Sequence, residues 1–218
     1  MFPRVSEQKI VYSKEPDNSA EYTSQLDLQY SKYTQLYDTA VKRLPVWKSW
    51  IKSVIPLIEG DRVLEVSFGT GYLLTQYARR FETCGIDFNP DMVQTAKDNL
   101  EAQGIKAELQ QANAASLPYQ DCTFDTVVNT MAFSGYPNGQ KVMEEFRRVL
   151  KPGGLLLIVD FEYPDNRNIA GYALTKLMEQ AGDTIRELSA LLRRNEFDFS
   201  EKEIGGFGSV HRYIARKT

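Results

Sequence analysis

Short apolar runs alternate along the chain with segments whose apolar residues recur at helical spacing. The apolar runs predict strands at residues 62–66, 84–87, 105–109, 124–129 and 155–160. Residues 155–160 are apolar almost throughout, which is typical of a strand at the buried centre of a parallel sheet. Because strands and helices alternate with short links, the pattern predicts an α/β fold with a doubly wound, Rossmann-like, mostly parallel sheet.

Helices are predicted between these strands and after the last of them, at residues 72–81, 89–104, 140–150 and 169–194. Asn89 and Pro90 indicate one helix start, because asparagine caps free N–H groups and proline suits the first helical position. Residues 197–217 hold a glycine-containing break between strand-like pieces. They predict a closing hairpin that makes the last strand antiparallel.

The N-terminal quarter has a different character. Residues 1–25 are polar and are predicted to be a weakly ordered arm or a lid. Two amphipathic helices are then expected, the first from about residue 28 to 44 and the second after Pro45. We therefore divide the chain into an arm and helical lid at 1–57 and a main domain at 58–218. The main domain carries a helical insertion at about 165–195.

Composition narrows the class of protein. A chain of 218 residues and 24.9 kDa fits one α/β domain with a small appendage. The net charge of −3 gives no drive towards nucleic acid, and we interpret pairs such as Arg147-Arg148 as solvated helix faces.

No apolar run is long enough for a transmembrane span, and the N-terminus lacks a signal-peptide core. Cys84 and Cys122 lie in segments expected to be buried or nearly so. With a single histidine they exclude a Cys/His zinc site, so we expect no metal and a cytoplasmic protein.

The candidate chemistry begins where the first strand ends. Gly69 and Gly71 allow a tight turn and a close backbone approach to a ligand, at the edge of the sheet where open α/β folds bind ligands. Glu65 precedes this turn and Asp87 ends the second strand. A nicotinamide dinucleotide site would place a third glycine where Leu74 stands, and its pyrophosphate gains nothing from Glu65. A cationic cofactor gains from Glu65, whereas Asp87 can accept hydrogen bonds from ribose hydroxyls and suits either cofactor.

Four segments carry a family resemblance: VLEVSFGTGYLL, GIDFNPDMV, QQANAASLPYQDCTFDTVV and EEFRRVLKPGGLLLIVD. They cover roughly residues 60 to 160. In their order and spacing they resemble the class I S-adenosylmethionine-dependent methyltransferases, and most of all the ubiquinone/menaquinone-biosynthesis group. The resemblance implies S-adenosyl-L-methionine (SAM) as cofactor and S-adenosyl-L-homocysteine (SAH) as product.

The resemblance also implies roles for particular residues. The methionine part of SAM would be held by Glu65, Ser67, Gly69 and Gly71, and the ribose by Asp87. Adenine would lie between Phe88 and Met92 with its edge at Asn113 and Ala114. Asn129 and Met131 would lie beside the methyl group, and Tyr33 would fold over the cofactor from the N-terminal helix. The sequence departs from the family at Ser67 for glycine, the bulky Phe68, Asn113 for aspartate, and a missing histidine pair after the fourth strand.

Catalysis needs little from the chain. Methyl transfer is an in-line displacement, so the protein aligns the acceptor, and a base is needed only if the acceptor loses a proton. Candidate catalytic residues are Tyr37, Tyr136 and His211, although tyrosines on a helix and a lone histidine are often purely structural.

The apolar residues of the N-terminal helices and of the helix at 165–195 suggest an apolar pocket wall, which favours a small hydrophobic or amphiphilic acceptor. The alternatives are a nicotinamide dehydrogenase and a catalytically inactive methyltransferase-fold protein that senses cofactor or binds a partner. The sequence leaves the oligomeric state open, a homodimer included.

Overall fold

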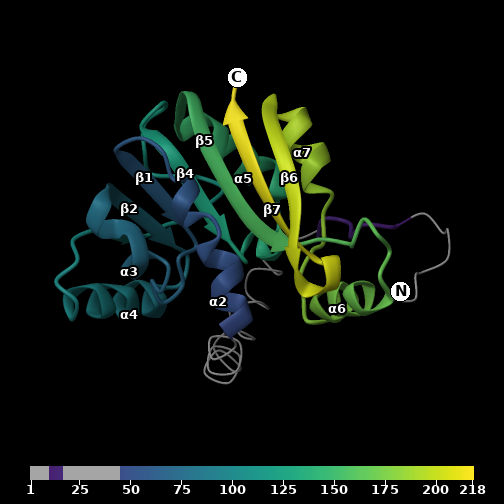
Figure 1. Cartoon of the computed structure of the whole chain (residues 1–218). Helices are drawn as coiled ribbons and strands as arrows, with labels where there is room; N and C mark the ends of the chain where they lie inside the picture. Colours follow the sequence, from purple (N-terminus) through teal and green to yellow (C-terminus); the bar gives the residue numbers. More distant parts are fainter. Residues whose placement is uncertain (1–9, 17–44) are drawn as a thin grey trace.

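A seven-stranded sheet forms the centre of the molecule (Figure 1). The computed structural model describes residues 10–16 and 45–218. The strands are β1 (Arg62–Val66), β2 (Glu82–Asp87), β3 (Glu108–Gln111), β4 (Phe124–Thr130), β5 (Leu150–Phe161), β6 (Phe197–Gly205) and β7 (Val210–Lys217). They lie in the order β3-β2-β1-β4-β5-β7-β6. β1 to β5 pair in parallel, whereas β7 runs antiparallel to both of its neighbours. The predicted mostly parallel sheet with an antiparallel last strand is confirmed.

Helices cover both faces of the sheet (Figure 1). They are α2 (Pro45–Lys52), α3 (Leu74–Tyr77), α4 (Pro90–Glu101), α5 (Gly139–Val149), α6 (Ile169–Gln180) and α7 (Leu188–Arg194). One buried cluster joins the sheet to α2, α3 and α4, and the other joins it to α5 and α7. Two buried faces explain why the central strands read as continuous apolar runs. In the described ranges, 10–16 and 45–218, no helix is long and apolar enough to cross a membrane.

Several predicted boundaries differ from the structure. The predicted helix 72–81 is the short α3 followed by a 3-10 turn at Ala78–Arg80, and β3 begins at Glu108 rather than residue 105. The predicted helix 169–194 is broken into α6 and α7, because Gly182 takes a φ of 114° and the residues after it are buried. The expected helix at 28–44 lies outside the described residues.

The strand order creates the crevice in which a ligand can bind. The chain moves outwards from β1 to β2 and β3 and then returns to the other side of β1 as β4. Helices that follow β1 and β4 therefore lie on opposite faces of the sheet, and the segments that leave the carboxyl ends of these two paired strands lead to opposite faces. That edge lies at the bottom of Figure 1, on the same side as α6.

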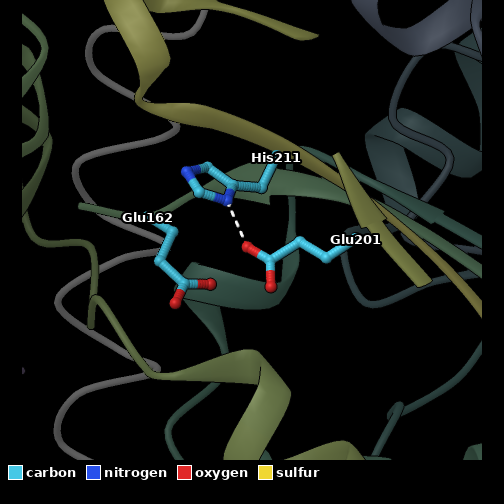
Figure 2. A group of neighbouring side chains, drawn as sticks. All are labelled: Glu162, Glu201 and His211. Carbon is cyan, nitrogen blue, oxygen red and sulfur yellow. Dashed lines mark hydrogen bonds and ion pairs between the residues drawn. The ribbon is translucent and has the colours of Figure 1, made fainter. Parts of the chain in front are cut away.

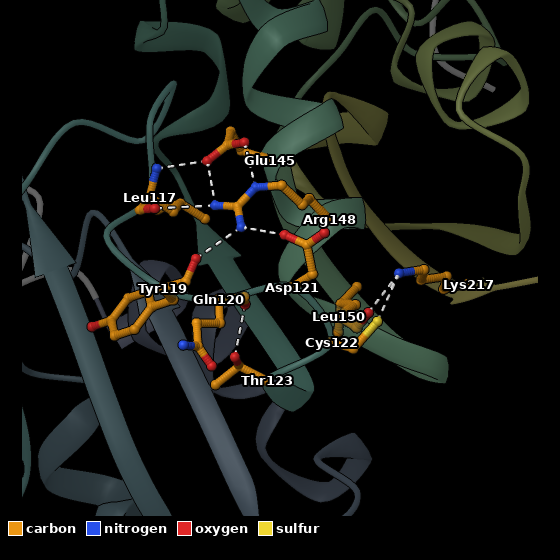
Figure 3. A network of polar contacts seen from close by, with 10 residues as sticks. All are labelled: Leu117, Tyr119, Gln120, Asp121, Cys122, Thr123, Glu145, Arg148, Leu150 and Lys217. Atoms are coloured by element: carbon orange, nitrogen blue, oxygen red, sulfur yellow. Dashed lines mark hydrogen bonds and ion pairs between the residues drawn. The ribbon is translucent and has the colours of Figure 1, made fainter.

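A single arginine holds the long link between β3 and β4 (Figure 3). Arg148 donates to the carbonyl oxygens of Leu117 and Tyr119 at 3.0 and 2.8 Å, and to the carboxylates of Glu145 and Asp121. Glu145 in turn accepts the backbone N–H of Leu117 at 2.6 Å. The interpretation of this arginine as part of a solvated helix face is wrong, because it binds the backbone of a loop that is distant in sequence.

Candidate cofactor site

The turn after β1 is built from residues in the left-handed backbone region. Ser67, Gly69 and Gly71 have φ values of 59°, 56° and 75°. A side chain at Gly71 would collide with the Cβ of Ala96, whereas the space beyond Gly69 is open. The glycines thus serve different needs: Gly71 lets α4 approach, and Gly69 leaves a cradle that any Cβ would begin to fill.

Asp87 ties this turn to the start of α4. One of its carboxylate oxygens accepts the N–H of Gly69 at 2.8 Å, and the other accepts the N–H of Asn89 at 3.0 Å. Asn89 caps α4 by accepting from the N–H groups of Asp91 and Met92. Since a carboxylate offers about four acceptor positions, holding the turn is compatible with accepting ribose hydroxyls as well.

Glu65 lies below the turn and is 2% exposed. The Tyr77 hydroxyl donates to it at 2.9 Å. Burial raises the pKa of Glu65 to about 8, with a further rise from the charge of Asp87 and an opposing effect of the Tyr77 hydrogen bond. This carboxyl group therefore carries a proton at neutral pH until a cation approaches it.

Phe68, the bulky departure from the family pattern, does not fill the crevice. Its ring is 6% exposed and packs against Gly85 of β2, where any side chain would clash with it. The ring thus replaces a missing side chain in the core.

The end of β2 and the link after β3 come together on the other side of the turn. Phe88 is 42% exposed, and its carbonyl oxygen accepts from the side chain of Gln111 at 3.0 Å. The N–H of Ala112 donates to the carbonyl oxygen of Asp87 at 3.0 Å. Asn113 is exposed and Ala114 is buried just beyond this contact. Met92 is half-buried in the first turn of α4, and its backbone N–H donates to the side chain of Asn89 at 3.1 Å.

A polar cluster closes the β4 side of the crevice. The Tyr136 hydroxyl lies 2.8 Å from the Ser67 hydroxyl and accepts from the Asn129 amide at 2.9 Å. The same amide donates to the carbonyl oxygen of Val66 at 2.9 Å. Met131 follows with a φ of 53° and bonds the carbonyl oxygen of Val159 through its N–H. Sequence reasoning treated Tyr136 only as an acceptor-side candidate, whereas the structure brings it to the predicted cofactor turn.

Comparison with known proteins identifies the family. A protein-family model described as a methyltransferase domain matches residues 63–154. The ubiquinone/menaquinone biosynthesis C-methyltransferase of Teredinibacter turnerae is 30% identical over 204 residues, which cover 85% of this chain and 81% of that protein. This chain belongs to the class I SAM-dependent methyltransferases. The family resemblance seen in the sequence is thereby confirmed.

Two other matches show what else this chain resembles. The phosphatidylethanolamine N-methyltransferase of Cereibacter sphaeroides is 37% identical over 128 residues, or 58% of this chain, and the chain spans 62% of that protein's length. A solved structure of a SAM-dependent methyltransferase from Thermotoga maritima has a TM-score of 0.70 at 19% identity, covering 87% of this chain and 99% of that one. The structural match shows the shared fold.

The cofactor of this methyltransferase family is SAM, and the residues present fit it. The cradle at Gly69 is open, and in the described part of the chain the buried Oδ1 atom of Asn129 has no hydrogen-bond partner. The acids Glu65 and Asp87 suit a cofactor that carries an ammonium, a sulfonium and a ribose. Tyr33 and Tyr37, the other predicted tyrosines, lie outside the described residues.

The only histidine of the methyltransferase is held inside the protein (Figure 2). His211 Nδ1 lies 2.5 Å from a carboxylate oxygen of Glu201, and Nε2 lies 2.8 Å from the carbonyl oxygen of Gly208. Burial lowers the pKa of His211, but the Glu201 hydrogen bond and the charge of Glu162 raise it, and the net shift is upward. With both ring nitrogens engaged, the geometry favours the structural interpretation of this residue.

A second polar region was missed by sequence reasoning. Residues 10–16 lie along the carboxyl edge of the sheet, where Tyr12 donates to Glu162 at 3.1 Å and Ser13 exchanges hydrogen bonds with Ile185. Burial raises the pKa of Glu162 to about 7. Tyr213 donates to the other oxygen of Glu162 at 2.5 Å. No local pattern indicates these contacts, because their partners are far apart in the sequence.

Proposed function

We propose that this chain transfers the methyl group of SAM to a small hydrophobic or amphiphilic acceptor by in-line displacement. The observation that carries the proposal is the pair of buried acids around one open turn. Asp87 fixes the turn through Gly69, and Glu65 lies beneath it with a raised pKa. Glu65 ionises when a cation approaches it, which suits the ammonium and sulfonium of SAM better than a pyrophosphate, and Asp87 suits the ribose.

The acceptor class is supported by an exposed apolar surface on the same side as the crevice. Ile169 and Leu177 of α6 are 43% and 56% exposed, and Phe207 beside α6 is 60% exposed. Large exposed apolar patches often mark sites that bind a ligand or a partner. The names of two relatives, a phosphatidylethanolamine and a ubiquinone/menaquinone methyltransferase, point to the same class of acceptor.

Bound SAM would supply an electrophilic methyl group on its sulfonium, so the chain's own task is orientation, exclusion of water and control of any proton. Burial raises the pKa of Tyr136, which keeps its hydroxyl neutral and makes it a poor base.

Calorimetric titration tests the cofactor assignment. SAM and SAH should bind to the purified protein, and NAD and NADP should not. Asp87→Ala should weaken SAM binding at least about a hundredfold, since it removes the ribose acceptor and the anchor of the turn. Asp98→Ala is the matched control, because Asp98 is exposed on α4 and should leave the affinity unchanged. Unchanged affinity in Asp87→Ala would contradict the ribose assignment.

The second candidate is a methyltransferase-fold protein that binds cofactor without transferring methyl groups. The bond between Ser67 and Tyr136 favours it, because it joins the two walls of the crevice through Ser67, which stands where the family pattern has glycine. Tight SAM binding with no SAH formed across a panel of lipids, quinones and small amines would select this candidate.

A further inference from the structure

Ser67, Tyr136 and Asn129 form a hydrogen-bonded triad on the β4 side of the crevice. Ser67 is part of the turn after β1, Asn129 lies near the end of β4, and Tyr136 lies in the link to α5. The hydroxyl of Tyr136 is within 2.9 Å of both partners. The triad therefore couples one residue of the cofactor turn to the opposite wall.

The orientation of each group in the triad is fixed by its partners. Asn129 must direct its NH2 group towards the carbonyl oxygen of Val66, so its second N–H points to the Tyr136 oxygen. Ser67 and Tyr136 then share one hydrogen bond with two hydroxyl protons. One hydroxyl proton is left to donate elsewhere, whichever of the two residues donates to the other.

The side chain of Asn129 also has a hydrogen-bond acceptor that is available to a ligand. Its side chain is fully buried, and within the described residues its Oδ1 atom has no hydrogen-bond partner. A buried acceptor without a partner is costly, and proteins rarely keep one unless a ligand or water completes it. The triad thus offers one donor and one acceptor side by side.

We propose that Tyr136, held in place by Ser67 and Asn129, determines specificity for the amino-acid end of SAM. This inference rests on the proposed function. The amino-acid end is a zwitterion, which needs an acceptor for its ammonium and a donor for its carboxylate, and the triad provides both. The residues predicted to bind the ribose and the adenine follow β2 and β3 and lie on the β2 side of the turn. The triad lies on the β4 side.

The test compares three ligands on one variant. Calorimetry should show that Tyr136→Phe weakens binding of SAM and SAH about tenfold, the effect of losing one hydrogen bond to a charged group. Binding of 5′-methylthioadenosine, which lacks the amino-acid end, should change less than twofold. Tyr119→Phe is the matched control, since its hydroxyl bonds Gln110 outside the crevice, and it should bind all three ligands like the parent protein.

Ser67→Ala provides a second, independent variant. It should show the same selective loss, and the double variant Ser67→Ala, Tyr136→Phe should lose no more than either single variant, because the two hydroxyls act as one unit. Equal weakening of all three ligands, or no weakening of SAM, would overturn the inference while leaving SAM binding by the parent protein intact. Failure of the parent protein to bind SAM would instead overturn the proposed function and this inference with it.

Discussion

The two ends of the carboxyl edge of the sheet are assembled differently. Around β1 and β2, the contacts join residues that are close in sequence, such as Gly69 with Asp87 and Asp87 with Asn89. Around β5 and β7, they join distant residues, such as Tyr12 with Glu162 and Tyr213 with Glu162. The first end is a local motif that can be read from spacing, and the second depends on the completed fold. Substitutions made at one end at a time test this contrast.

The largest expected effect is a dependence of the free energy of unfolding on pH, which arises from Glu65 at the β1 end. Glu65 has a native pKa of about 8 against an ordinary 4.5, so the native state binds more protons between these values. Stability of the ligand-free protein should therefore fall as pH rises through this window, by about 1.4 kcal/mol per pH unit from this group. Urea unfolding of Glu65→Gln should show a flatter profile, and Asp98→Asn should keep the parent profile. A parent profile in Glu65→Gln would mean that Glu65 is ionised in the native protein.

The second largest expected effect is a loss of stability at the β5 end. Glu162→Leu should lower the free energy of unfolding by about 3 kcal/mol, because it strands the buried hydroxyl of Tyr213 and that of Tyr12 without an acceptor. Asp198→Ala, on exposed β6, should change it by less than about 0.5 kcal/mol. If both variants unfold at the same urea concentration, the carboxyl group of Glu162 does not hold this region together.

A smaller and local effect is expected in the segment 10–16. Tyr12→Phe removes one hydrogen bond to Glu162 and should cost about 1 kcal/mol. Hydrogen exchange at the N–H groups of Ser13 and Ile185, which bond across this contact, should accelerate about fivefold, while exchange in β1 stays unchanged. Val11→Ala is the control, because Val11 is 76% exposed. Equal acceleration in both variants would show that Tyr12 is not the anchor.

The smallest effect sharpens the adenine assignment. Asn113→Asp places a charged acceptor at the predicted adenine edge and should tighten SAH binding by about two- to fivefold. S-inosylhomocysteine, which has no exocyclic amino group, should gain nothing. A similar gain for both ligands would place the new charge away from the base.

The sequence predicted the fold and the β1 end well, because strand periodicity and the spacing of Glu65, the glycines and Asp87 are local signals. It could not predict that Phe68 turns into the core, since that depends on the empty space at Gly85. The contact between Ser67 and Tyr136 was equally hidden, because a positive φ and a distant loop decide where that hydroxyl points. The backbone role of Arg148 also follows only from the folded loop.

The two cysteines, both expected to be buried or nearly so, differ in the structure. Cys122 is exposed, at a position where the backbone has a φ of 53°. Cys84 is buried in β2, and burial together with the charge of Glu108 raises the pKa of its thiol to about 11. A maleimide dye at neutral pH would therefore label Cys122 and spare Cys84. The protein already carries a single attachment point for a fluorophore just before β4, at the edge of the sheet opposite the predicted cofactor site, without any engineered residue.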